Sequence, residues 1–170
     1  MKEFKDFVQQ HQLQQASVVG SSIQAILSKV ETLQQTRNHV DTLQIELGKA
    51  LGYYTKLNAD MLSSVAAIGK KAEDPLLANA LFSYEAFLLS KERAGIERAV
   101  LTNTFARNSF APGFYERFIR LVSEQDSFMS LFVKHGSESS LKVYNEITKD
   151  DSFAQVKAFR KIASEKAQQG

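Results

Sequence analysis

The sequence predicts an all-α protein, and three observations lead to that prediction. The apolar residues recur at spacings of three and four, which is the period of one helix face. Alternating apolar runs bounded by turns are absent, as are the Asn-Gly and Asp-Gly pairs that mark hairpins. Only 2 prolines and 8 glycines interrupt 170 residues. We therefore expect an antiparallel four-helix bundle with an additional N-terminal helix.

Composition excludes several classes of protein. Hydrophobic residues make up 44% and charged residues 24%, which is ordinary for a globular domain. The net charge of +2 gives no reason to expect nucleic acid as a partner. Cysteine is absent, which excludes disulfides and thiolate metal sites. No stretch reaches the roughly 20 apolar residues of a membrane span, and no signal-peptide pattern occurs.

Two helices are predicted in the first part of the chain. Residues 2–19 form an amphipathic pattern whose apolar side carries Phe4, Phe7, Val8, His11 and Leu13. From residue 26 to residue 68, core positions alternate spacings of four and three without a break, as in antiparallel bundles. We therefore expect one long helix there, with possible kinks at Gly48 and Gly52.

A turn and a second long helix follow. Asp74 is expected to cap a helix that begins at Pro75 and continues to about residue 106. This helix carries two apolar stripes. One contains Leu77, Leu81, Tyr84, Leu88, Lys91, Gly95, Arg98, Thr102 and Phe105, and the other contains Phe82, Ala86, Leu89, Arg93, Ile96, Val100 and Asn103. A helix with two apolar sides is expected at the centre of a bundle or in a dimer interface.

The remaining sequence predicts another long helix and two shorter helical segments. A loop at residues 107–111 leads to Pro112, which opens a helix with phenylalanines at heptad spacing that stops near Gly136. A polar break at residues 137–140 precedes the next segment, and residues 150–152 are a start signal for a last amphipathic helix. The faces of that helix carry Phe153, Val156, Phe159, Arg160 and Ala163.

Polar residues occupy core positions of these patterns and indicate a candidate site. In the predicted helix at residues 26–68 they are Arg37, Gln44 and Asn58. In the helix from Pro75 they are Lys91 and Arg98 in the first stripe and Arg93 in the second, and in the next helix the residue is Gln125. Any one of them can extend out of the core or set helix register. As a group they favour a binding site, because buried polar groups are costly unless something hydrogen-bonds them.

Helix register brings part of this group to one level. Pairing the helices on either side of residue 109 sets Glu124 and Gln125 level with Arg93. Pairing the helices on either side of the turn at Asp74 sets Tyr53 opposite Arg93. One layer would then hold Tyr53 or Tyr54, Arg93 and Gln125, with Arg98 and Gln44 about one turn away. Arg37 falls ~15 Å beyond Arg98 at 1.5 Å per residue, so it joins only through a bend or a second subunit.

The two arginines of the third helix differ in their expected partners. Arg93 has Glu97 four residues later, which suits an ion pair within the helix. Arg98 has no acid four residues away, so its partner must come from another helix or be a bound anion. The forked donors of a guanidinium suit a carboxylate or a small planar oxyanion. Gly95 would let a neighbouring backbone or a ligand approach.

Catalytic and metal-binding motifs are not found. The histidines at 11, 39 and 135 are isolated, with no His-x-x-x-His or Glu-x-x-His spacing. The sequence has no phosphate-binding glycine loop and no nucleophile elbow. We therefore expect a protein that is not an enzyme and that has no cofactor and no metal.

Residues 53–132 resemble the nitrate- and nitrite-sensing domain of bacterial receptors. The run KERAGIERA at residues 91–99 carries most of the likeness, supported by YYTKLN at 53–58, TFA at 104–106 and RNHVD at 37–41. The resemblance implies a helical sensor bundle that dimerises and binds nitrate or nitrite through arginines. It also implies the periplasmic part of an inner-membrane chemotaxis receptor, or of another signalling protein or antiterminator. By position, Arg93 and Arg98 would take the arginine roles.

One element of the family pattern is missing. Family members usually carry an Arg-Gly pair after a Leu-Gln in the first helix, whereas here Leu13-Gln14 is followed by Gln15. If that arginine forms half of an anion clamp, this chain senses a different ligand or none.

Two functions follow as hypotheses. In the first, residues 1–170 are a single sensor domain cut from a longer membrane receptor, and a small anion between the helices shifts a helix toward the membrane. Its ligand-binding residues would be Arg98, Arg93, Arg37, Gln125, Tyr54 and Gln44. The alternative is a sensor-like bundle that recognises another small molecule or a protein, in which Arg98 pairs with an acid such as Asp41, Glu46 or Glu124.

Overall fold

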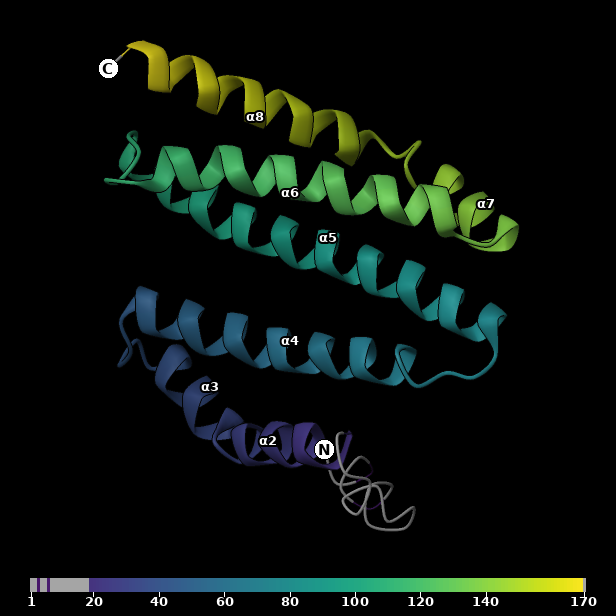
Figure 1. Ribbon diagram of the computed structural model, residues 1–170. Coiled ribbons are helices and arrows are strands. Elements are labelled where there is room, and N and C mark those ends of the chain that lie inside the picture. Colours follow the sequence, from purple (N-terminus) through teal and green to yellow (C-terminus); the bar gives the residue numbers. More distant parts are fainter. Residues whose placement is uncertain (1–2, 4–5, 7–18, 170) are drawn as a thin grey trace. The chain divides into compact units, whose positions relative to one another are not determined.

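The regular structure of this chain is helical throughout the residues that the computed structural model describes, which are 3, 6 and 19–169. The helices are α2 (Val19–Glu31), α3 (Leu33–Asp41), α4 (Leu47–Gly69), α5 (Pro75–Arg107), α6 (Phe114–His135), α7 (Glu138–Ile147) and α8 (Asp151–Gln169) (Figure 1). The all-α prediction is therefore confirmed, while the four-helix arrangement stays a prediction. The N-terminal helix expected at residues 2–19 lies mostly outside the described residues.

The chain divides into two compact units, residues 1–85 and residues 86–170, and the division falls inside α5. We call them the N-terminal unit and the C-terminal unit. In the N-terminal unit, α2 packs on α4. Its core consists of Ile26, Val30, Leu33 and Leu57, with Tyr53 and Tyr54 packed against them. The Tyr53 hydroxyl donates to the Lys29 carbonyl at 2.5 Å, which ties α4 to α2.

The prediction of one continuous helix from residue 26 to residue 68 is wrong. The chain turns between α3 and α4, and Leu43 takes a left-handed conformation with φ of 55°. The Gln44 amide donates to the His39 carbonyl at 2.7 Å, and the Leu43 amide donates to the Val40 carbonyl at 3.1 Å. This pair of bonds is a Schellman ending, which normally uses glycine at the left-handed position. Because leucine stands there instead, the sequence carried no stop signal.

Other helix ends follow the predicted capping residues. The Leu76 amide donates to the Asp74 carboxylate at 2.9 Å, so Asp74 caps α5 as expected. At the far end of α5, Asn108 is left-handed with φ of 56°, a conformation that asparagine tolerates. The Ser152 amide donates to Asp150 at 2.9 Å at the start of α8. That contact lowers the pKa of Asp150, through the side-chain and backbone hydrogen bonds of Ser152.

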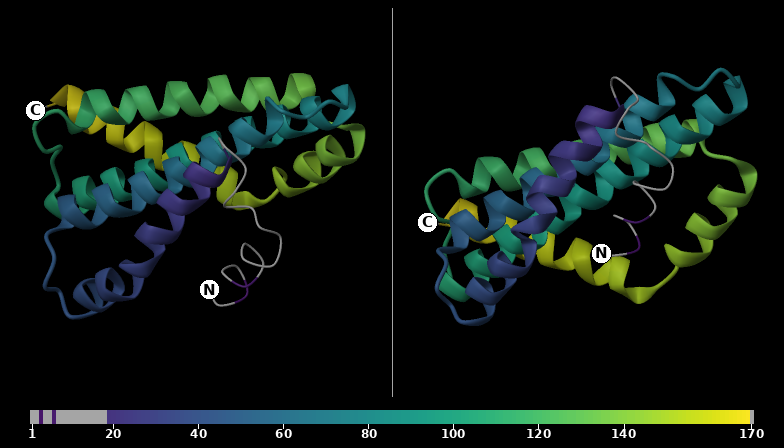
Figure 2. Two further views of the ribbon diagram at one scale, coloured as in Figure 1. Left: turned by 60° about the horizontal axis from the view of Figure 1, so that its bottom comes forward. Right: turned by 90° about the horizontal axis from the view of Figure 1, so that it is seen from below.

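In the C-terminal unit, the second part of α5 runs beside α6, and α8 packs against them through its second half (Figures 1 and 2). The core contains Val100, Leu101, Phe118, Leu121 and Ala163, so each of these three helices contributes to it. Phe118 and Ala163 are each 1% exposed. Side chains from all three helices therefore meet at one level of this unit, and the candidate site lies there.

The buried face of α5 shares Ala86 and Val100 with the second predicted stripe and differs from the first predicted stripe. In the C-terminal unit it consists of Ala86, Ser90, Glu97, Val100, Leu101 and Thr104. Lys91, Gly95 and Arg98, which belong to the first predicted stripe, are exposed. Small polar residues fit the interior because they are hydrogen-bonded: Ser90 donates to the Gln125 carbonyl at 3.2 Å and Thr104 donates to the Val100 carbonyl at 2.9 Å.

Candidate functional site

A buried carboxylate lies inside the KERAGIERA run. Glu97 of α5 is 3% exposed. Arg160 of α8 donates to it twice, from Nε to Oε1 at 2.7 Å and from Nη2 to Oε2 at 2.7 Å. Gln125 of α6 donates from Nε2 to Oε2 at 2.6 Å. A bidentate arginine and an amide thus compensate the buried charge from two other helices.

The Gln125 amide is satisfied at both ends. Its Oε1 accepts a hydrogen bond from Arg160 Nη2 at 2.8 Å, and its Nε2 also donates to the Leu121 carbonyl at 3.1 Å. These bonds set the orientation of the amide and close a ring of contacts among Glu97, Gln125 and Arg160. We call these three residues the buried triad. It joins α5, α6 and α8.

The electrostatics of the buried triad favour the charged form of Arg160. The hydrogen bond to Glu97 raises the pKa of Arg160 above its ordinary value, and the charges of Glu97 and Asp126 act in the same direction. Partial burial opposes this rise in pKa. Arg160 is therefore a cation at neutral pH.

Arg93 pairs with α6 rather than within its own helix. Its Nε donates to Glu124 Oε2 at 2.7 Å, and its guanidinium lies 5.3 Å from the centre of the Phe128 ring. The expected pair with Glu97 is wrong, because Glu97 is engaged by Arg160. The predicted register of α5 and α6, which set Glu124 level with Arg93, is confirmed by this contact.

Arg98 is exposed, contrary to its expected place in the core. Among the residues that the structure describes, it makes no hydrogen bond or ion pair through its guanidinium. A Cβ added at Gly95 would meet no described atom within 4 Å, so open space surrounds this turn of α5. Of the two arginines in the KERAGIERA run, one is thus paired and one is free to bind.

The other predicted ligand residues lie in the N-terminal unit. Arg37 is exposed on α3, and Gln44 is exposed in the turn that follows α3 instead of in a helix. Tyr54 is half-buried and its ring meets Tyr53 edge-on, with centroids 5.5 Å apart. The structure thus brings Arg93 and Gln125 onto facing helices, while Arg37, Gln44 and Tyr54 stay predictions from the sequence.

Arg160 was not among the predicted site residues, although a signal for it existed. It lies in the same stripe as Ala163, three residues later, which is among the most buried residues of the chain. A charged residue in an apolar stripe was the criterion that selected Arg93 and Arg98. The same criterion, applied to the last helix, would have selected Arg160.

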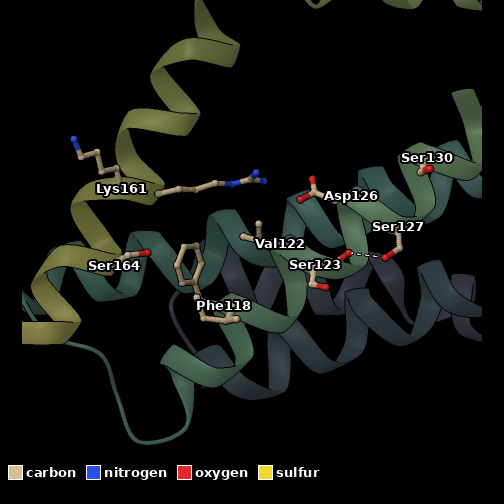
Figure 3. Close-up of a pocket in the computed structure, with 10 residues that line it drawn as sticks. Phe118, Val122, Ser123, Asp126, Ser127, Ser130, Lys161 and Ser164 are labelled. Carbon is tan, nitrogen blue, oxygen red and sulfur yellow. Dashed lines mark hydrogen bonds between the residues drawn. The ribbon is translucent and has the colours of Figure 1, made fainter.

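An open groove of about 700 Å³ runs between α6 and α8 (Figure 3). Its α6 side carries Val122, Ser123, Asp126 and Ser127, and its α8 side carries Arg160, Lys161 and Ser164. Within the described part of the chain, no three acids or histidines gather closely enough to hold a metal ion. The lining residues of the groove thus carry hydroxyl groups and charges of both signs.

Comparisons with known proteins agree with the KERAGIERA resemblance. The nitrate regulatory protein of Klebsiella oxytoca is 27% identical over 99 residues, which cover 56% of this chain and 25% of that protein. The match thus spans a quarter of the length of its curated relative. No solved structure matches the chain. No helix in the described ranges has the length and apolar character to cross a membrane. The family model for nitrate and nitrite sensing matches residues 1–170, so the chain belongs to the nitrate and nitrite sensing (NIT) family.

Proposed function

We propose that this chain is the ligand-binding domain of a bacterial chemoreceptor and that it binds a small anion, nitrate or nitrite, through Arg98. One observation carries the proposal: Arg98 is the arginine of the KERAGIERA run whose charge no described acid compensates. Arg93 and Arg160 are held by Glu124 and Glu97. An exposed guanidinium can donate two parallel hydrogen bonds to a planar oxyanion.

The setting of the domain forms part of the same proposal. We place it in the periplasm, as part of an inner-membrane receptor that works as a homodimer. Anion binding would favour one of two helix positions by its differential affinity, and the shift would pass to the membrane. Membership of the nitrate and nitrite sensing family supports a sensory role, and the similarity to a nitrate regulatory protein supports nitrate as the signal.

A second candidate function rests on the paired arginines. Arg93 and Arg160 are both engaged by acids, and Gln15 follows Leu13-Gln14 where the family usually has an arginine. A helical sensor that recognises another small molecule or a protein partner is consistent with those two facts. The anion experiment below separates the two candidates.

The test is titration calorimetry with nitrate and nitrite at millimolar concentration, with sulfate as a comparison. We expect heat with nitrate or nitrite, and a rise in melting temperature of roughly 5–10 °C at a hundred times Kd. Arg98→Ala should abolish both signals, because it removes the forked donor and leaves the folded protein unchanged.

The matched control is Arg107→Ala, which removes another exposed arginine of α5 outside the KERAGIERA run. It should bind nitrate like the unaltered chain. Circular dichroism of both variants checks that they fold. Absence of heat with every anion would eliminate the anion proposal, and unchanged binding by Arg98→Ala would remove Arg98 from the site.

A further inference from the structure

Arg160 lines the groove between α6 and α8, and three hydrogen bonds hold its guanidinium in place. Its Nε and Nη2 are used by Glu97 and Gln125, and its Nη1 makes no hydrogen bond with any described residue. The side chain is 23% exposed and lines the groove. A guanidinium held by a buried carboxylate is a pre-organised donor, because a ligand need not order it on binding.

Asp126 contributes the opposite charge to the same groove. It lies on α6, is exposed, and makes no hydrogen bond or ion pair with the described residues. Figure 3 shows it on the groove side of α6, near Ser123 and Ser127. Its charge acts on Arg160, yet the two side chains are not directly bonded. A molecule that carries both charges can bridge them.

The rest of the lining is suited to a small amphipathic ligand. Ser123, Ser130 and Ser164 offer hydroxyls, which can donate or accept hydrogen bonds. Ile119, 46% exposed, and Val122 supply an apolar wall. An anion without a positive group, bound at the free edge of Arg160, would be repelled by the negative charges of Glu97 and Asp126. A cation without a negative group would be repelled by Arg160.

We propose that the groove between α6 and α8 binds a zwitterion, namely an α-amino acid with an apolar side chain. The ligand carboxylate binds the Nη1 edge of Arg160, the ligand ammonium binds Asp126, and the side chain packs on Ile119 and Val122. This site is separate from Arg98, so it does not depend on nitrate binding.

The first experiment tests the requirement for both charges. The full chain is titrated calorimetrically with L-leucine, with 4-methylpentanoate, which lacks the amine, and with 3-methylbutylamine, which lacks the carboxylate. At concentrations up to about 10 mM, which detect millimolar Kd values, we expect leucine to bind and each analogue to bind at least about tenfold more weakly. No heat with leucine, or equal binding of the three compounds, would overturn the proposal.

The second experiment tests Asp126. Asp126→Asn should weaken leucine about tenfold and should tighten 4-methylpentanoate, because it removes the charge that repels a bare carboxylate. A loss of structure would not produce this reversal. Glu116→Gln is the matched control, since it neutralises an exposed acid of α6 outside the groove and should change neither affinity.

The two proposed sites can fail independently. Nitrate heat should be lost in Arg98→Ala and retained in Asp126→Asn, while leucine binding should be unchanged in Arg98→Ala and about tenfold weaker in Asp126→Asn. If Asp126→Asn binds leucine like the unaltered chain, the zwitterion site is wrong whatever the nitrate result. Arg160 is left intact in these variants because it also compensates the buried Glu97.

Discussion

A single buried carboxylate links three helices of the C-terminal unit. Glu97 is compensated by Arg160 in a bidentate pair and by the Gln125 amide. Removing one partner of a buried pair leaves an unpaired charge away from water, and such changes are typically more costly than the pair itself is stabilising. At the residue scale, therefore, we expect the stability of this unit to depend more on Arg160 than on either arginine of the KERAGIERA run.

The first prediction compares two arginines with different burial. Arg160→Met should lower the free energy of unfolding by about 3 kcal/mol, because Glu97 stays buried without its cation. Arg93→Met should cost about 1 kcal/mol or less, because Arg93 and Glu124 are 27% and 36% exposed. Urea denaturation measures both values.

A double variant tests the cause of that difference. Glu97→Gln combined with Arg160→Met should recover much of the loss, because no unpaired charge remains buried. Equal costs for Arg160→Met and Arg93→Met would show that the bidentate pair has no special role in stability.

At the scale of elements, close packing determines which residue can stand at the junction of α6 and α7. Gly136, between α6 and α7, has an ordinary φ of −67°, so its backbone needs no glycine. An added Cβ would lie 2.8 Å from the Phe132 carbonyl oxygen and 3.1 Å from Leu141 Cδ2. Space, and not conformational freedom, requires glycine there.

The second prediction concerns that junction. Gly136→Ala should destabilise the protein by about 1–3 kcal/mol, as overpacking does, because the nearest atom belongs to the backbone. Gly95→Ala is the matched control and should stabilise it by up to about 1 kcal/mol, since it lies in a helix with open space around it. Thermal denaturation compares the two, and a Gly136→Ala variant as stable as the parent would refute the packing argument.

At the scale of the whole molecule, large apolar side chains remain in solvent on α5. Leu77 and Tyr84 are 50% and 52% exposed and lie on one row of this helix. These two side chains lie two turns apart on the same side of α5, and exposed apolar surface that is contiguous marks interaction sites. In the proposed homodimer, Leu77 and Tyr84 would be buried against the second subunit.

The third prediction tests the dimer. Light scattering at micromolar concentration should give twice the mass of one chain, and Leu77→Glu should lower it by placing a charge in the apolar row. Leu43→Glu is the control, because Leu43 is 90% exposed in an isolated turn and should leave the mass unchanged. A monomer mass at every concentration would exclude the dimer for this chain.

The sequence by itself determined the helical class, the family resemblance and most helix ends. The cap at Asp74, the loop after α5 and the end of α6 are local features, because each depends on residues within one turn. The level of Glu124 with Arg93 was also predictable, since a short loop and a constant rise per residue determine antiparallel register.

The tertiary structure alone decided which charges pair and which polar residues of α5 are buried. Arg160 and Glu97 are 63 positions apart in the chain, so no helical period relates them. Arg93 and Arg98 both occupied predicted core stripes, yet the first pairs with α6 and the second is exposed. The reason is physical: periodicity records the apolar residues of a helix, whereas hydrogen bonds from neighbouring helices let polar residues such as Ser90 and Glu97 be buried.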